Sequence, residues 1–258
     1  MAIDFHSRAN RGAYAGRHAD DGWKAAIRRI VDPSGKRVVD IGCGGGIYSR
    51  AWHELGAASV VGIDFSQAMV DAAREQATGV ADLSFQRGDA AATGLPPASV
   101  DIVFERALIH HLQGCYWPCF AEAHRVLAAG GTLIVQDRTP DDVRLPSSSE
   151  HLRGYFFECF PRLLAIETDR RPTDAAVRTA FEAAGFTKIE MSVLWEVRKV
   201  HRDWQEMRQE LATRTGRSIL HDLSDTELAG LIRYIEKRLP ADEPIAEKDR
   251  WTVWSAAA

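Results

Sequence analysis

From about residue 36 onward, short apolar runs rich in β-branched residues alternate with longer segments whose apolar residues recur at helical spacing. This alternation is typical of βαβ units, in which helices connect parallel strands. Runs this short and this apolar predict strands that are buried on both faces. The strands predicted in this part are 37–41, 60–64, 83–86, 101–105 and 132–137. The pattern therefore predicts an α/β fold with a mostly parallel sheet and helices on both faces.

Helices are predicted between these strands, over residues 47–55, 66–75 and 115–127. A further helix is expected from the cap residue Thr173 to a closing glycine, Gly185. Strand-like runs at 186–200 and 251–254 complete a sheet of seven strands. Between them, residues 201–249 have a helical pattern with a capping box at Ser224 and Glu227. We therefore expect a helical insertion between the last two strands.

The composition favours one domain that acts on small molecules. A chain of 258 residues with 45% hydrophobic content can bury one sizeable core, so we expect a single domain over 1–258, with cap elements at 1–20, 138–172 and 201–249. The formal charge of -4 gives no reason to expect binding to nucleic acid. The sequence has no signal-peptide pattern and no apolar run of membrane-spanning length, which predicts a cytoplasmic protein without membrane insertion. It leaves the oligomeric state open.

A glycine-rich segment follows the first predicted strand, where Asp40 precedes Gly42, Gly44 and Gly46. Glycine permits a positive φ and lets a ligand approach the backbone closely. Nicotinamide, flavin and adenosylmethionine enzymes all use such a loop. The dinucleotide fingerprint, however, needs a third glycine where this chain has Ile47, whose branched side chain hinders close packing of helix on strand. The segment therefore argues against a cofactor that carries a pyrophosphate.

Four motifs in order make the sequence resemble the class I S-adenosylmethionine-dependent methyltransferases, specifically the type 11 group that includes quinone-biosynthesis C-methyltransferases. The motifs are the glycine loop, the acidic end of the second strand in VVGIDFS, the GDA at 88–90 and the AHRVLAAGG before the fifth strand. The resemblance covers roughly residues 36–137. It implies a Rossmann-like class I methyltransferase fold and S-adenosyl-L-methionine as the cofactor.

The resemblance also implies a role for individual residues. Asp40 would lie near the methionine amino group, Asp64 would accept hydrogen bonds from both ribose hydroxyls, and Asp89 would read the adenine edge. The cofactor-binding residues that it implies are Asp40, Gly42, Cys43, Gly44, Gly46, Asp64, Phe65, Met69, Asp89, Ala90 and Arg106. No metal is expected, because the Asp-Asn pair of metal-dependent catechol-type enzymes is missing, although Glu105, Asp137 and Asp141 could imitate such ligands.

Methyl transfer is an in-line displacement, so the enzyme must chiefly hold the acceptor atom against the methyl carbon and exclude water. Carbon and hydroxyl acceptors benefit from a general base, for which histidine is suited. His110 and His111 follow the fourth predicted strand, at the edge of the sheet where the active-site cleft opens. Either is a candidate base. The alternative is that one packs beneath the next helix and the other lies at the surface.

The predicted acceptor is a small molecule held by the segments outside the core match. Candidate substrate-binding residues are Asp137, Arg138, Tyr155, Arg214, Arg217 and His221. Ordinary ion pairs between arginines and acids are the competing interpretation. Residues 105–108 lack the turn that amino-methyltransferases of adenine or glutamine carry at this position. Two other functions stay open: a non-catalytic protein that binds adenosylmethionine, and a nicotinamide-dependent oxidoreductase.

Overall fold

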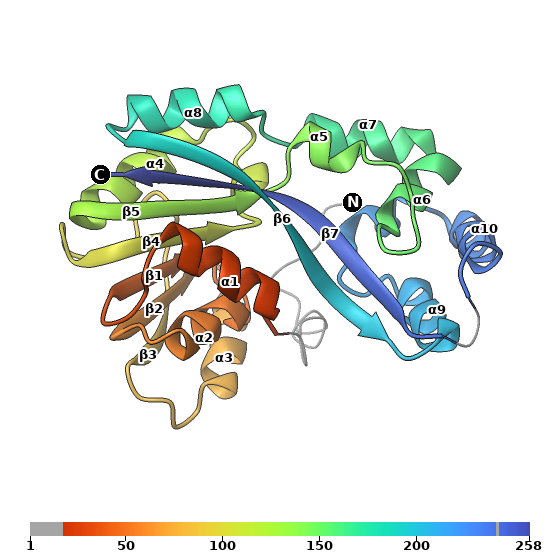
Figure 1. Ribbon diagram of the computed structural model, residues 1–258, viewed down its shortest axis with the longest axis horizontal. Helices are drawn as coiled ribbons and strands as arrows, with labels where there is room; N and C mark the ends of the chain where they lie inside the picture. The colour runs from red at the N-terminus through yellow and green to blue at the C-terminus, as the bar shows by residue number, and fades with distance from the viewer. Residues whose placement is uncertain (1–17, 241–242) are drawn as a thin grey trace.

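The computed structural model describes residues 18–240 and 243–258, and it contains a seven-stranded sheet (Figure 1). The strands are β1 (Arg37–Ile41), β2 (Ser59–Asp64), β3 (Leu83–Arg87), β4 (Val100–Arg106), β5 (Leu127–Asp137), β6 (Thr187–His201) and β7 (Ile245–Ala257). They lie in the order β3-β2-β1-β4-β5-β7-β6. β1 to β5 are parallel, and β7 is antiparallel to both of its neighbours. The predicted α/β class and mostly parallel sheet are confirmed.

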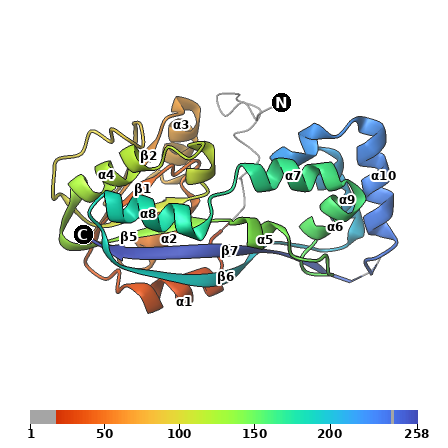
Figure 2. The ribbon, with the colours of Figure 1, turned by 90° about the horizontal axis from the view of Figure 1, so that it is seen from above.

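Helices cover both faces of the sheet, because successive residues of a buried strand point to opposite sides. The helices of this part are α1 (Asp21–Ile30), α2 (Ile47–Glu54), α3 (Gln67–Gln76), α4 (Trp117–Val126) and α8 (Asp174–Ala183). In β1, Val38 packs into the core with residues of α1 and α2, whereas Val39 packs into the core with residues of α4 and α8. In β4, Phe104 packs into the same core as Val38, and Val103 packs into the same core as Val39. Figure 2 shows α4 and α8 on one side of β5 and β7, and α1 on the other.

A second group of helices packs around a separate apolar core at the far end of β6 and β7 (Figures 1 and 2). These elements are α5 (Pro140–Val143), α6 (Arg153–Cys159), α7 (Pro161–Asp169), α9 (Trp204–Ala212), the short 3-10 helix η3 (Ser218–Asp222) and α10 (Asp225–Glu236). Phe156, Met207 and Leu231 lie buried at its centre. The chain between β6 and β7 therefore shares one core with residues 140–169. Residues 1–17 of the cap element predicted at 1–20 lie outside the described residues.

The seventh strand extends far past the predicted 251–254. It pairs with β5 only from Thr252 to Ala257, and residues 245–251 pair with β6 alone, so the two strands form an arm that reaches the second core. The helical pattern expected for 245–249 is wrong. Every second residue of this stretch is buried, but two of the buried positions are Glu247 and Asp249. Charged residues on the buried face hid the alternation that a strand normally shows.

None of the helices within 18–240 and 243–258 is both long and apolar enough to cross a membrane.

Candidate functional site

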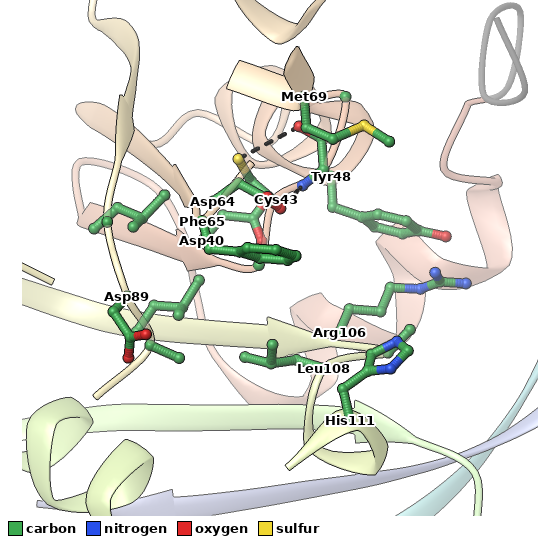
Figure 3. A pocket seen from close by; sticks show the side chains of 18 of the residues that line it. Asp40, Cys43, Tyr48, Asp64, Phe65, Met69, Asp89, Arg106, Leu108 and His111 are labelled. Carbon is green, nitrogen blue, oxygen red and sulfur yellow. Dashed lines mark hydrogen bonds between the residues drawn. The ribbon is translucent and has the colours of Figure 1, made fainter. Parts of the chain in front are cut away.

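A cavity of about 360 Å³ opens at the carboxyl ends of β1, β2 and β4, beside the N-terminus of α2 (Figure 3). Its size is that of a small-molecule site. Ten of the eleven residues implied as cofactor-binding line it: Asp40, Gly42, Cys43, Gly44, Asp64, Phe65, Met69, Asp89, Ala90 and Arg106. Parallel strands deliver their carboxyl ends to one edge of the sheet, which explains why residues up to 66 positions apart in the chain meet here.

The glycine loop shapes one wall of this cavity. Gly46, which is not among the lining residues, adopts φ +74° at the start of α2, and a Cβ there would lie 2.7 Å from the Phe85 ring. Gly46 therefore serves to let the backbone turn into α2 close to Phe85. Gly44, also at positive φ, donates its backbone N–H to Asp64 Oδ2 over 2.9 Å. The loop is thus tied to the end of β2.

Two buried carboxylates lie on this edge of the sheet. Asp64 accepts backbone N–H donors at both oxygens, from Gly44 and from Ser66, each at 2.9 Å. Asp40 accepts a hydrogen bond from the Ser49 hydroxyl at 2.6 Å. Burial raises the pKa of Asp40 to about 7 against the effect of that bond, and nearby Asp64 adds to the rise. The cavity wall therefore favours a cationic group close to Asp40.

The far side of the cavity is formed by less buried residues. Phe65 exposes 49% of its surface beside the end of β2. Asp89 lies in the loop after β3, where its Oδ1 accepts the Ala91 backbone N–H at 2.8 Å. An exposed aromatic ring can stack on a planar ligand, and a fixed carboxylate in the same cavity lining can read the edge of that ligand.

Arg106, the last residue of β4, places a fixed cation in the cavity wall. Its guanidinium lies between the rings of Tyr48 and Trp251, 4.2 Å from each ring centroid, and it donates to Glu196 over 2.9 Å. The Tyr48 hydroxyl also hydrogen-bonds Glu196. Burial opposes the charge, but Glu196 and Tyr48 together raise the pKa of Arg106 above its usual value. Tyr48 lines the cavity as well, although no pattern in the sequence marked it as a site residue.

The two predicted histidines lie in the short 3-10 helix η2 (Ile109–His111), and only His111 is among the described residues that line the cavity. His111 lines the cavity (Figure 3), and its ring lies 4.0 Å from that of His110. His110 Nδ1 lies 2.9 Å from Asp137 Oδ2. Burial lowers the pKa of both rings, and with His110 close by, that of His111 falls to about 4. Both histidines are therefore neutral at pH 7, and Asp137 orients His110.

The predicted substrate-binding residues are not brought together, and none is among the described residues that line the cavity. Arg138 is buried beside Asp249 at 2.6 Å, and Tyr155 is buried in the second core. Arg217 is fully buried, with Glu247 at 2.5 Å and Glu210 at 3.3 Å. Arg214 donates to two backbone carbonyls and to Asp225, whereas His221 is exposed on η3. The ion-pair interpretation therefore describes Arg214 and Arg217 in this structure.

The acidic residues weighed as metal ligands also lie apart from the cavity lining. Glu105 is fully buried and accepts a hydrogen bond from the Cys119 thiol, whereas the Asp141 side chain is 88% exposed. Elsewhere in the described part, His201, Glu210 and Glu247 come close enough to hold an ion. The Arg217 guanidinium contacts both of these glutamates, so an ion pair accounts for the group.

Comparison with known proteins agrees with this geometry. Residues 39–135 match the family model of the methyltransferase domain. The trans-aconitate 2-methyltransferase of Acidovorax sp. (strain JS42) is 33% identical over 122 residues, which are 47% of this chain and 45% of that protein. The 27-O-demethylrifamycin SV methyltransferase of Amycolatopsis mediterranei (strain S699) is 32% identical over 126 residues, which are 46% of each. The matched stretch thus spans a little under half the length of these relatives.

The fold is shared more widely than the sequence. A Haemonchus contortus phosphoethanolamine N-methyltransferase 2, crystallised with S-adenosylhomocysteine, superposes with a TM-score of 0.61 at 19% identity, covering 99% of this chain and 60% of that chain. Other relatives by sequence are named as methyltransferases of ribosomal RNA and of ribosomal protein L11. The likeness establishes the Rossmann-like class I methyltransferase fold.

Proposed function

We propose that this chain, whose residues 39–135 match the methyltransferase domain model, transfers a methyl group from S-adenosylmethionine to a small-molecule acceptor. The observation that carries the proposal is the cavity at the carboxyl ends of β1, β2 and β4, which gathers the glycine loop, Asp40, Asp64 and Asp89. Asp40, Asp64 and Asp89 lie at or just after the ends of β1, β2 and β3 in turn. In this order they would meet the amino acid, the ribose and the adenine of the cofactor.

In this proposal the cofactor lies across the edge of the sheet. Asp64 accepts hydrogen bonds from the ribose hydroxyls, because two backbone donors already fix its carboxylate. The adenine lies between Phe65 and Met69, with Asp89 at its edge. The methionine ammonium lies near Asp40, whose unfavourable burial it relieves, and the methionine carboxylate faces the fixed cation of Arg106.

The acceptor enters past η2, where a base is available. His110 Nδ1 faces Asp137, so in its neutral form the ring carries a proton at Nδ1 and leaves Nε2 as an acceptor. In an in-line displacement the acceptor atom gives up a proton as the methyl carbon is transferred. We assign His110 to take that proton, Asp137 to position His110, and His111 to contact the acceptor from the cavity rim.

Binding and turnover test the proposal separately. Calorimetry should detect both S-adenosylmethionine and S-adenosylhomocysteine, and tight binding of NADH with no response to either sulfur compound would overturn it. Transfer from an isotopically labelled methyl donor to a mixture of metabolites should then yield a labelled product. Binding without any transfer would favour the non-catalytic adenosylmethionine-binding protein.

A further inference from the structure

Seven charged side chains meet between the sheet and the second core, beside the proposed base. They are Arg138, Arg153, Arg170, Arg171, Asp137, Glu167 and Asp249. The arginines all come from the stretch between β5 and α8, whereas the carboxylates come from β5, α7 and β7. The group therefore joins the parallel sheet to the arm that carries the second core.

The contacts in this group leave one positive charge unmatched. Asp137 pairs with Arg171 at 2.9 Å. Asp249 lies 2.6 Å from Arg138 and 3.2 Å from Arg153. Glu167 accepts from both Arg170 and Arg171. Four guanidinium groups thus share three carboxylates.

Neighbouring acids do not supply the missing charge. Glu196 is paired with Arg106, and Asp142 is paired with Arg250 at 2.6 Å. Glu247 is shared between Arg198 and Arg217. A surplus charge in a buried group is costly, so a ligand that cancels it would bind favourably.

Unused hydrogen-bond donors accompany the surplus charge. The Nε–H groups of Arg138, Arg170 and Arg171 are buried and have no acceptor among the residues that the structure describes. Burial, together with the neighbouring Arg153, lowers the pKa of Arg138 to about 9. The unpaired donors and the lowered pKa both indicate that the group carries more positive charge than its three carboxylates can neutralise.

Arg170 is the member through which this charge reaches solvent. Its side chain is 29% exposed, whereas those of Arg138 and Arg171 are 7% and 4% exposed. Arg170 shares Glu167 with Arg171, and Arg171 contacts Asp137. Asp137 in turn contacts His110, whose ring lies 4.0 Å from that of His111 in the cavity lining. A chain of direct contacts therefore joins Arg170 to the rim where the acceptor would enter.

We propose, building on the function proposed above, that the methyl acceptor carries a carboxylate and that this carboxylate binds at Arg170, which the contacts described above join to η2. The planar guanidinium of arginine matches a carboxylate in geometry and charge. A single surplus charge suits a carboxylate better than a phosphate monoester, which carries about -1.5 to -2 at neutral pH. The cavity then holds the donor, η2 holds the base, and Arg170 orients the acceptor.

The test uses the full chain saturated with S-adenosylhomocysteine, and it measures thermal unfolding and calorimetric binding. The probes are acetate and benzoate, each compared with its neutral amide at equal ionic strength. We expect the two carboxylates to raise the unfolding temperature and the two amides to leave it unchanged. Equal behaviour of acids and amides, or no response to either, would overturn the proposal without reference to any variant.

Variants then locate the site. Arg170→Gln should weaken benzoate binding by about tenfold or more, which is the range expected for loss of a charged hydrogen bond. Arg170→Lys should restore part of the affinity. The matched control is Arg162→Gln at the other end of α7, an exposed arginine paired with Glu227, and it should bind benzoate like the parent chain.

The outcome separates the two proposals. If S-adenosylhomocysteine itself does not bind, the proposed function fails before the carboxylate site is reached. If it binds and Arg170→Gln leaves benzoate affinity unchanged, only the carboxylate site is refuted.

Discussion

The two halves of the molecule are held together by different means. Around the cavity at the carboxyl ends of β1, β2 and β4, apolar strand residues such as Val39 and Val103 form the core, and the charged groups lie at strand ends. Along the arm of β6 and β7, buried acids such as Glu247 and Asp249 take positions that apolar residues would occupy in an ordinary strand. The first half therefore depends on local patterning, whereas the arm depends on ion pairs between residues far apart in the chain.

Because of this difference, we expect substitutions in the arm to change stability and substitutions in the cavity wall to change ligand binding. The acids buried in the arm are held in ion pairs, whereas Asp40, Asp64 and Arg106 line the cavity that a ligand would fill. The boundary between the halves lies at Asp137, which contacts His110 on one side and Arg171 on the other. Substitutions on either side of this boundary should have distinct effects.

The largest effect is expected at the boundary itself. His110→Ala should lower kcat by about 10²- to 10⁴-fold, because it removes the proposed general base, while affinity for S-adenosylhomocysteine stays the same. Steady-state kinetics with the identified acceptor checks this. His53→Ala on α2 is the control. An unchanged kcat in His110→Ala would remove the base from the mechanism.

Removal of an ion pair within the arm should lower the stability of the protein and not the rate of methyl transfer. Arg217→Met should lower the free energy of unfolding by about 3–5 kcal/mol, because it leaves Glu247 and Glu210 without their shared buried partner. Denaturant titration measures the change. Arg202→Met, at an 84% exposed side chain in the same region, should cost little. If the two variants were equally stable, the buried pairs would contribute nothing to folding.

A change in the cavity wall should act on the cofactor. Asp64→Ala should weaken binding of S-adenosylhomocysteine by about 100-fold, because hydrogen bonds to a charged acceptor are each worth about 1.5–3 kcal/mol. Asp64→Asn should keep more of the loop structure, since its amide oxygen can still accept a backbone N–H. Calorimetry compares both with Asp71→Ala on α3. Unchanged affinity would place the ribose elsewhere.

The smallest effect concerns pH and the core beneath the cavity. Burial raises the pKa of Glu105 to about 7, partly offset by the Cys119 hydrogen bond, so the folded state retains a proton that the unfolded state loses above pH 4.5. Stability should therefore fall as the pH rises from about 4.5 to 7. In Glu105→Gln this pH-dependent loss in the free energy of unfolding, on the order of 2 kcal/mol, should be absent. Thermal unfolding at pH 5 and pH 8 tests this, and equal slopes for both proteins would contradict it.

Local sequence was enough to predict most of the polar residues that line the cavity. In a parallel sheet, the residue that ends a buried strand must lie at the edge where the other strands also end, so Asp40, Asp64 and Asp89 could be placed together without coordinates. Gly46 could be assigned to the loop but not to its actual task, since only the packed structure shows Phe85 where a Cβ would lie.

The surroundings of Arg106 and the arm were decided by tertiary structure alone. Glu196 and Trp251 reach Arg106 from strands about 90 and 145 positions further along the chain, and no local pattern relates them. The strand at 245–251 was hidden for the same reason, because its buried Glu247 and Asp249 are stable only through arginines supplied by other elements. Periodicity records which side chains avoid water, and it carries no information on which distant charge will pair with which.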